Sequence, residues 1–215
     1  MQCPSYASDI SYRKKLFVKE LLGYNADIVC LQEVDTKIFE NDLYPVFSTK
    51  KFDGFYVKCD EIGSEQGTAS FWNVDKFKLR ESSQFIFREI VQRDSEFQDM
   101  LDVLNKNEKW KEAFMDRGET LQISILDSRV GNQGRLILSN SIGTSPKISY
   151  LIISKLHISG LILATTHIFW NPKFAHIKLL QSGVVMRILE KTARHLSQED
   201  PTRTYSILLC GDFNR

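Results

Sequence analysis

Three short apolar runs, each followed by polar side chains, constrain the fold of this chain more than any other feature. The runs cover residues 27–32, 161–166 and 206–210, and they are followed by Glu33, by His167 and by the Gly-Asp-Phe-Asn segment 211–214. Short runs rich in aliphatic and β-branched residues are typical of strands buried on both faces. A buried strand fixes its backbone, so the residue just past it is held at a rim that a substrate can reach. The sequence therefore predicts a site built from strand ends.

Helical and strand patterns alternate along the rest of the chain. Apolar residues at helical spacing predict helices over residues 11–23, 95–117 and 174–195, with a short helical turn over 36–41. Further strands are predicted over residues 52–58, 68–72, 78–87, 121–126 and 150–154. Residues 127–146 are rich in Gly, Asn and Ser and are interpreted as an inserted loop. Strand pairs mixed with strand-helix-strand units predict an α/β (α+β) chain: a two-sheet β-sandwich flanked by helices, in one domain over residues 1–215.

Composition indicates a globular protein without a long-range charge field. The chain has 215 residues, is 42% hydrophobic, and carries 28 Lys and Arg against 27 Asp and Glu. An anionic substrate must therefore be held by local groups and a metal. Cys30 and Cys210 lie inside apolar runs and are interpreted as reduced core thiols. Residues 1–10 lack a signal-peptide pattern and 150–167 are too short to span a bilayer, so we expect an intracellular protein without a membrane segment.

The polar strand ends suggest a metal site, although each one alone has an ordinary structural explanation. Glu33 and Asp212, if they meet, supply the hard oxygen ligands that Mg²⁺ prefers, and Asn214 projects to the same side as Asp212 in extended backbone. Taken separately, Glu33 also fits a solvent-facing carboxylate and His167 a hydrogen-bonded histidine at a sheet margin. The segment 211–214 also fits a turn in which Asp and Asn bond their own backbone.

Together these motifs resemble the exonuclease-endonuclease-phosphatase superfamily, which has a Leu-Gln-Glu strand end, a Thr-His strand end and a Gly-Asp-x-Asn turn in this order. The resemblance covers residues 11–214. Leu31-Gln32-Glu33-Val34-Asp35 is similar to the deadenylase-like branch, and the segments 23–27 and 167–172 are most similar to its 2′,5′-phosphodiesterase subgroup. The resemblance implies a four-layer αββα fold like that of deoxyribonuclease I.

The resemblance also implies a role for each site residue. Glu33 would ligate Mg²⁺, with Asp212 and Asn214 as further metal ligands, and Asp212 would orient or deprotonate the attacking water. His167 and Asn214 would hydrogen-bond the phosphoryl oxygens. Pro172 matches a position that packs against an adenine, and it fits equally well as the start of the helix that follows. Phe71 and Trp72 match a strand near the substrate groove, but aromatic residues in a strand are more often core.

The implied function is that of a metal-dependent phosphodiesterase acting on RNA, a 3′-exonuclease that removes adenylates from 2′,5′-oligoadenylate and poly(A). The alternatives are a general poly(A) deadenylase without 2′,5′ preference and a non-catalytic RNA-binding remnant. We expect RNA or oligoadenylate as substrate, with no membrane or protein partner, in the mitochondrial matrix or the cytoplasm.

The family pattern also extends beyond this chain. The family begins with an Asn-containing strand and ends with a Ser-Asp-His strand end, and neither occurs in the 215 residues. We therefore expect a domain incomplete at both ends, with its C-terminal strands missing and the fragment itself inactive.

Overall fold

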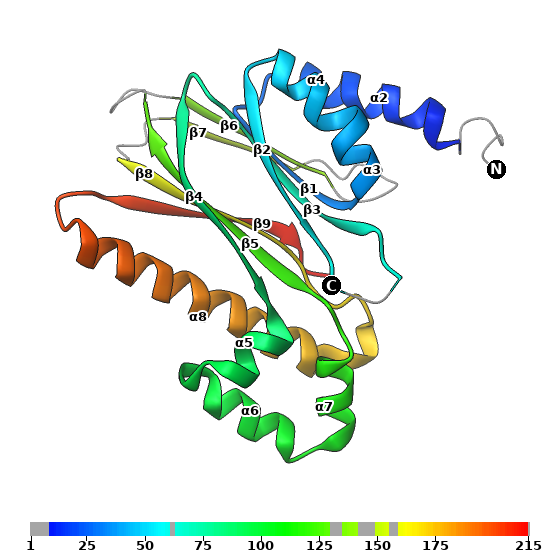
Figure 1. Cartoon of the computed structure of the whole chain (residues 1–215), viewed down its shortest axis with the longest axis vertical. Coiled ribbons are helices and arrows are strands. Elements are labelled where there is room, and N and C mark those ends of the chain that lie inside the picture. The colour runs from blue at the N-terminus through cyan, green and yellow to red at the C-terminus, as the bar shows by residue number, and fades with distance from the viewer. Residues whose placement is uncertain (1–8, 61–62, 130–134, 142–148, 155–158, 215) are drawn as a thin grey trace.

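Two β-sheets pack face to face at the centre of the molecule, and helices cover both outer surfaces (Figure 1). The computed structural model describes residues 9–60, 63–129, 135–141, 149–154 and 159–214. One sheet has the strand order β2-β3-β1-β6-β7 and the other the order β4-β5-β8-β9. The strands are β1 (Ile28–Asp35), β2 (Phe52–Lys58), β3 (Gln66–Asn73), β4 (Phe77–Ile86), β5 (Thr120–Ser128), β6 (Arg135–Ser141), β7 (Ser149–Ser154), β8 (Gly160–His167) and β9 (Tyr205–Asp212).

Two groups of helices form the outer layers. On the β1 sheet lie α2 (Ile10–Gly23), α3 (Thr36–Ile38), the π-helical turn η1 (Phe39–Leu43) and α4 (Tyr44–Thr49). On the β5 sheet lie α5 (Phe87–Arg93), the 3₁₀ turn η2 (Ser95–Phe97), α6 (Gln98–Asn105), α7 (Glu108–Met115), η4 (Pro172–Phe174) and α8 (Ala175–Glu199). The four layers are the αββα arrangement that the motif resemblance implies.

Three hydrophobic clusters fill the three spaces between these layers. The largest lies between the β5 sheet and its helices, and it includes Leu121, Phe97 and Val184. A second lies between the two sheets and includes Ile28, Trp72 and Leu161. The third joins the β1 sheet to α2 and α4. Phe71 and Trp72 are fully buried in these clusters, so the core interpretation of both aromatic residues is confirmed.

The space between the sheets changes from apolar to polar along the strands. Side chains alternate between the two faces of a strand, so every second residue points inward. At one end the inward residues are Ile28, Trp72 and Leu161. Toward the other end the same alternation reaches Gln32, Thr68 and Thr165, which are also buried. The polar end of this interior lies directly under the strand ends that carry Glu33 and His167.

The two core cysteines meet in this interior. Cys30 of β1 is fully buried and Cys210 of β9 packs against the same inter-sheet cluster. A hydrogen bond with Cys210, together with burial, raises the pKa of the Cys30 thiol well above its ordinary value.

Most of the predicted elements are present, but three predictions are wrong in part. The loop predicted over residues 127–146 contains β6, which pairs in parallel with β1 (Ile28 opposite Leu138); residues 130–134 and 142–146 of that loop lie outside the described part. The single helix predicted over 95–117 is divided into η2, α6 and α7. The helical turn predicted over 36–41 continues as far as Thr49.

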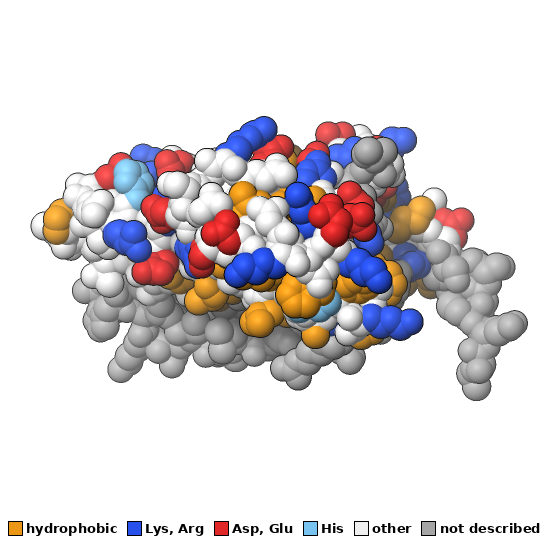
Figure 2. Space-filling model, turned by 90° about the horizontal axis from the view of Figure 1, so that it is seen from below, with side chains coloured by type: hydrophobic (Ala, Val, Ile, Leu, Met, Phe, Trp, Pro, Cys, Tyr) orange, Lys and Arg blue, Asp and Glu red, His pale blue; other side chains and the backbone are white. Residues whose placement is uncertain are grey.

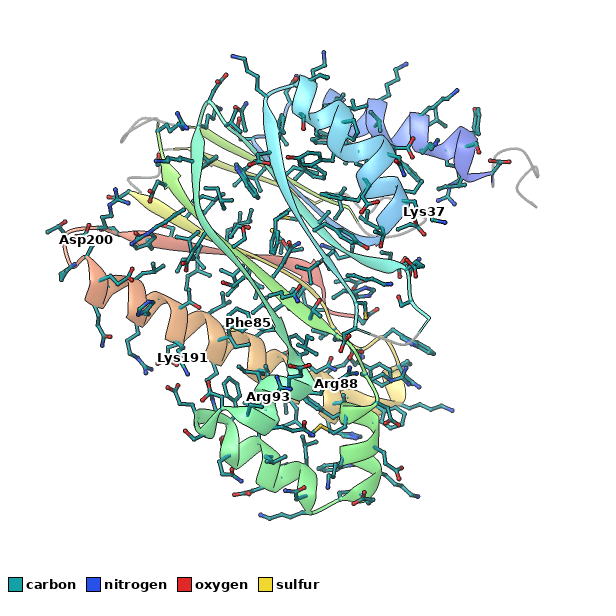
Figure 3. All side chains as sticks on the ribbon, in the orientation of Figure 1. Lys37, Phe85, Arg88, Arg93, Lys191 and Asp200 are labelled. Atoms are coloured by element: carbon teal, nitrogen blue, oxygen red, sulfur yellow. The ribbon has the colours of Figure 1, made fainter. Side chains whose placement is uncertain are left out.

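The helical layer on the β5 sheet is tied together by ion pairs. Arg187 of α8 binds Asp99 of α6 (Nη1 to Oδ1, 2.5 Å), which lowers the pKa of Asp99 to about 2. Lys191 of α8 binds Asp94 (2.6 Å), and Figure 3 shows Lys191 on α8 close to the α5 region that carries Arg88 and Arg93. On the face seen in Figure 2, acidic and basic side chains are interspersed, as the near-zero net charge leads one to expect. No helix within the described ranges is both long and apolar enough to cross a membrane.

We predict that Phe47→Ala lowers the free energy of unfolding by about 3–5 kcal/mol, because the truncation leaves a cavity under α4. Phe47 is 1% exposed and stacks on Phe71 with ring centroids 4.4 Å apart. Leu179→Ala is the matched control, since Leu179 on α8 is 75% exposed and should change stability by less than about 0.5 kcal/mol. Urea unfolding of both variants tests this, and equal effects would show that α4 does not pack as described.

Candidate active site

Glu33 is turned toward the rim of the sandwich by a bulge in β1. The pairing of β1 with β3 shifts register between Leu31 and Val34, and both of these residues pack into the outer core under the helices. Residues three apart face the same way in a strand only when an extra residue is inserted between them. Glu33 has φ +56, a left-handed conformation that is uncommon outside glycine, and it is exposed. Packing on both sides therefore holds a strained residue with its side chain outside the core.

His167 and Asp212 meet at the ends of two parallel neighbours. In the register of β8 and β9, His167 lies opposite Asp212. Parallel strands end at the same edge of a sheet, so their last side chains are brought together. His167 Nε2 lies 3.9 Å from Asp212 Oδ2. The two strand ends singled out in the sequence therefore form one polar pair.

The Gly-Asp-Phe-Asn segment is a tight turn that is bonded back to the end of β8. Gly211 is required there, because a Cβ would lie 2.3 Å from the carbonyl oxygen of Thr166. Asn214 N donates to Asp212 Oδ1 (2.9 Å), which is the turn geometry expected of Asp followed by Asn. Asn214 Nδ2 donates to the carbonyl oxygen of Ile168 (2.7 Å), and Ile168 N donates to that of Asp212 (3.1 Å). Asn214 therefore holds His167 and Asp212 together.

A cleft of about 180 Å³ lies between the strand ends. Its lining residues come from both sheets: Glu33, Cys59, Ser64, Gln66, Gly67, Thr68, Glu119, Thr120, His167, Ile168 and Trp170. Glu33 and His167 thus face one cleft, although their strands belong to different sheets. Asp212 and Asn214 are not among these lining residues; they lie at the neighbouring strand end, next to His167 and Ile168.

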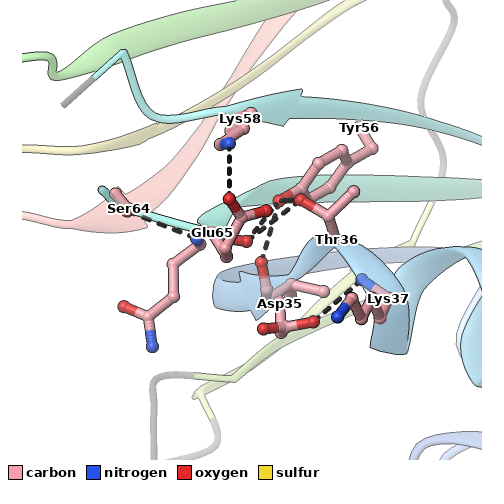
Figure 4. A network of polar contacts seen from close by, with 9 residues as sticks. Asp35, Thr36, Lys37, Tyr56, Lys58, Ser64 and Glu65 are labelled. Atoms are coloured by element: carbon pink, nitrogen blue, oxygen red, sulfur yellow. Dashed lines mark hydrogen bonds and ion pairs between the residues drawn. The ribbon is translucent and has the colours of Figure 1, made fainter. Parts of the chain in front are cut away.

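A network of hydrogen bonds fixes the Glu33 wall (Figure 4). Tyr56 Oη donates to the carbonyl oxygen of Val34 (3.1 Å), the residue after Glu33. Thr36 N donates to the carbonyl oxygen of Glu65 (2.9 Å), and Lys58 Nζ lies 3.0 Å from Glu65 Oε1. These bonds join the segment after Glu33 to the segment before Gln66. The two lining residues Glu33 and Gln66 are therefore held in place by the same contacts.

The remaining predictions for the site have mixed outcomes. Pro172 is the first residue of η4, and Asn171 caps this turn, so Pro172 has the helix-start position that was the alternative. Pro172 is exposed and is not among the residues that line the cleft. Within the described ranges no three His, Cys, Asp or Glu side chains lie close enough to hold a metal ion by themselves. The adenine contact of Pro172 and the metal roles of Glu33, Asp212 and Asn214 stay predictions.

Trp170 and Glu119 are among the cleft residues to which the sequence assigned no role. Trp170 is 64% exposed and lines the cleft three residues after His167. Glu119 comes just before β5, whose Leu121 lies opposite Thr166 of β8. The start of an antiparallel strand lies beside the end of its neighbour, so Glu119 reaches the His167 edge. Only the strand pairing reveals this, because nothing in the local sequence around Glu119 does.

Comparison with known proteins gives relatives in sequence. No protein-family model matches the chain. Among curated proteins, the 2′,5′-phosphodiesterase 12 of Mus musculus is 30% identical over 212 residues, covering 99% of this chain and 29% of that protein. The CCR4-Not complex 3′-5′-exoribonuclease subunit Ccr4 of Candida albicans is 29% identical over 222 residues, covering 98% and 24%. The chain thus spans less than a third of the length of these relatives.

The fold has relatives among solved structures. The crystal structure of ANGEL2, described as a 2′,3′-cyclic phosphatase in complex with adenosine-2′,3′-vanadate, matches with a TM-score of 0.68 at 20% identity. The match covers 99% of this chain and 46% of that one. At this identity the match speaks for the fold, and the sequence relatives point to the same group. The sequence relatives and the fold therefore fit the deadenylase-like branch of the exonuclease-endonuclease-phosphatase superfamily.

Proposed function

We propose that the protein containing this chain is a divalent-metal-dependent phosphodiesterase that acts as a 3′-exonuclease on RNA and removes adenylates from 2′,5′-oligoadenylate and poly(A). The observation that carries the proposal is the meeting of three strand ends: Glu33 and His167 face one cleft, and Asp212 lies 3.9 Å from His167. The names of the sequence relatives, a 2′,5′-phosphodiesterase and a 3′-5′-exoribonuclease, support the same chemistry.

The donor set fits Mg²⁺. Glu33 offers an exposed carboxylate on the cleft, and Asp212 and Asn214 add oxygen atoms at the neighbouring strand end. Magnesium keeps several waters and takes only one or two carboxylates together with substrate phosphate oxygens, so it needs no cluster of three acidic side chains. A bound Mg²⁺ would polarise the phosphate and stabilise the charge that develops on it.

The protein side chains then have separate tasks at the reacting phosphate. The carboxylate of Asp212, held by Asn214 N through Oδ1, accepts a proton from the attacking water. His167, on the cleft, hydrogen-bonds a phosphoryl oxygen. Both groups are fixed before the substrate arrives, because Asn214 and Ile168 bond the turn to the end of β8.

Preference for the 2′,5′ linkage rests on sequence similarity. The segments 23–27 and 167–172 resemble the 2′,5′-phosphodiesterase subgroup, and the mouse relative carries that name. The Ccr4 relatives are named 3′-5′-exoribonucleases, and this name supports the alternative of an exonuclease without 2′,5′ preference.

The proposal is tested with the full-length protein on 2′,5′-linked and 3′,5′-linked oligoadenylate, with Mg²⁺ and with a chelator. We expect adenosine monophosphate to be released from both substrates, faster from the 2′,5′-linked one, and only when the metal is present. Hydrolysis of the 3′,5′ linkage alone would favour a general deadenylase. Binding without hydrolysis would favour a non-catalytic RNA-binding protein.

We predict that Asp212→Asn lowers turnover by roughly 10²–10⁴-fold, because an amide cannot accept the proton of the water. Folding should be preserved, since the amide oxygen still accepts the hydrogen bond from Asn214 N. Asp75→Asn is the matched control, because Asp75 pairs with Lys51 on the surface next to the far end of β3. Turnover and thermal unfolding of both variants decide the point, and near-normal turnover of Asp212→Asn would refute the role of this carboxylate.

We further predict opposite effects of Glu33→Gly on stability and on activity. Glycine adopts φ +56 without strain, whereas alanine and glutamate are strained there by about 1–2 kcal/mol. Glu33→Gly should therefore be more stable than Glu33→Ala by about 1 kcal/mol, while both lose hydrolysis. Urea unfolding and oligoadenylate hydrolysis measure the two effects. A glycine variant that is less stable than the alanine variant would contradict strain at this position.

A further inference from the structure

A buried glutamine on α8 joins two segments on the His167 side of the cleft, one just after β8 and one just before β5. Gln181 is 0% exposed on a helix face that is otherwise apolar, with Ile177 and Val184 one turn away on either side. Its Oε1 accepts a hydrogen bond from Phe169 N (2.8 Å), and its Nε2 donates to Glu119 Oε2 (3.1 Å). Both ends of the amide are therefore satisfied, as a fully buried polar group requires.

Both partners of Gln181 are connected to the cleft. Phe169 lies two residues after His167 and one before Trp170, and Glu119, His167 and Trp170 all line the cleft. The next residue back, Ile168, is bonded to the Asp212–Asn214 turn. The segment 167–170 is thus fixed from one side by the turn that carries Asp212 and from the other side by Gln181.

The neighbouring contacts strengthen this arrangement. The Arg117 guanidinium lies 4.6 Å from the centre of the Phe169 ring. Thr166 Oγ1 donates to the carbonyl oxygen of Thr120 (2.8 Å), so β8 and the start of β5 are also bonded directly at this edge. An apolar residue at position 181 would fill the same space, but it would leave Phe169 N–H buried without a partner, which costs about 1–3 kcal/mol.

We propose that Gln181 is a positioning residue for the hydrolysis: by holding Phe169 and Glu119 together, it fixes His167 and Trp170 at the distance from the opposite wall that the substrate phosphate needs. This proposal rests on the proposed function. Gln181 touches neither the substrate nor the reacting atoms, and it acts through the backbone that follows His167. Small displacements of a catalytic group lower the rate strongly. Hydrogen bonds that fix the backbone next to His167 therefore affect turnover without touching the substrate.

The test uses Gln181→Met in the full-length protein, because methionine has a similar shape and makes neither hydrogen bond. Val184→Ala is the matched control: Val184 is 0% exposed on the same helix, so its truncation destabilises the same core without changing the two hydrogen bonds. We expect Gln181→Met to lower kcat roughly 10–100-fold with little change in KM, and Val184→Ala to leave kcat unchanged at a temperature where both variants are folded. Equal losses in both variants would overturn the proposal.

A double-mutant cycle tests the path through Glu119. Glu119→Met and Gln181→Met break the same hydrogen bond, so the double variant should lose little more kcat than Gln181→Met alone. Independent, multiplying losses would show that the two residues act separately and would overturn the coupling.

Hydrogen exchange separates failure of this proposal from failure of the proposed function. If the wild-type protein hydrolyses none of the oligoadenylates, the proposed function fails, but the positioning of residues 167–174 is still measurable. Gln181→Met should then speed amide exchange in the peptide that contains Phe169 more than Val184→Ala does. Equal exchange in the two variants would overturn the positioning role of Gln181.

Discussion

The face-to-face packing of two sheets is the constraint on which the rest of the structure depends. The inward residues of β1, β3 and β8 are apolar at one end and polar at the other, so one end of the interior is a hydrophobic core and the other supports a cleft. The apolar end supplies the free energy that holds the strands in register. The same strands continue into the polar end and are held in place by the apolar end, so side chains from the two sheets keep a fixed separation at the cleft.

Strain at the cleft is supported by ordinary packing next to it. Glu33 has φ +56, and Leu31 and Val34 on either side of it pack into the same outer core. In a regular strand Glu33 would face the helices, as Leu31 does two residues earlier, and a carboxylate is costly to bury there. The bulge therefore lets one strand serve both the core and the cleft, and the Tyr56 and Glu65 contacts hold the backbone beyond it.

The sequence predicted the parts of the site that lie at the ends of strands. An apolar run indicates a buried strand, and the residue that follows the run lies at the edge of the sheet. The positions of Glu33, His167 and Asp212 at strand ends were predicted in this way, and their catalytic and metal-binding roles stay predictions. It could not predict Glu119 or Gln181, whose roles depend on partners 62 residues apart in the chain. The strand β6 was missed because its Gly-, Asn- and Ser-rich surroundings are typical of loops, and parallel pairing with β1 overrides that local preference. A proline at the start of a helix can also pack against an adenine, so the sequence pattern did not separate these two roles of Pro172.

The bulge in β1 also means that the fold and the site residue Glu33 can be lost independently during evolution. Loss of the Glu33 codon would restore regular pairing with β3 and leave the outer core in place. The resulting chain would still fold as a sandwich, but its cleft would lack this carboxylate. Inheritance of the architecture and inheritance of the chemistry are therefore separable by a single in-frame deletion, and descendants that keep only the architecture would be recognised by the length of this strand.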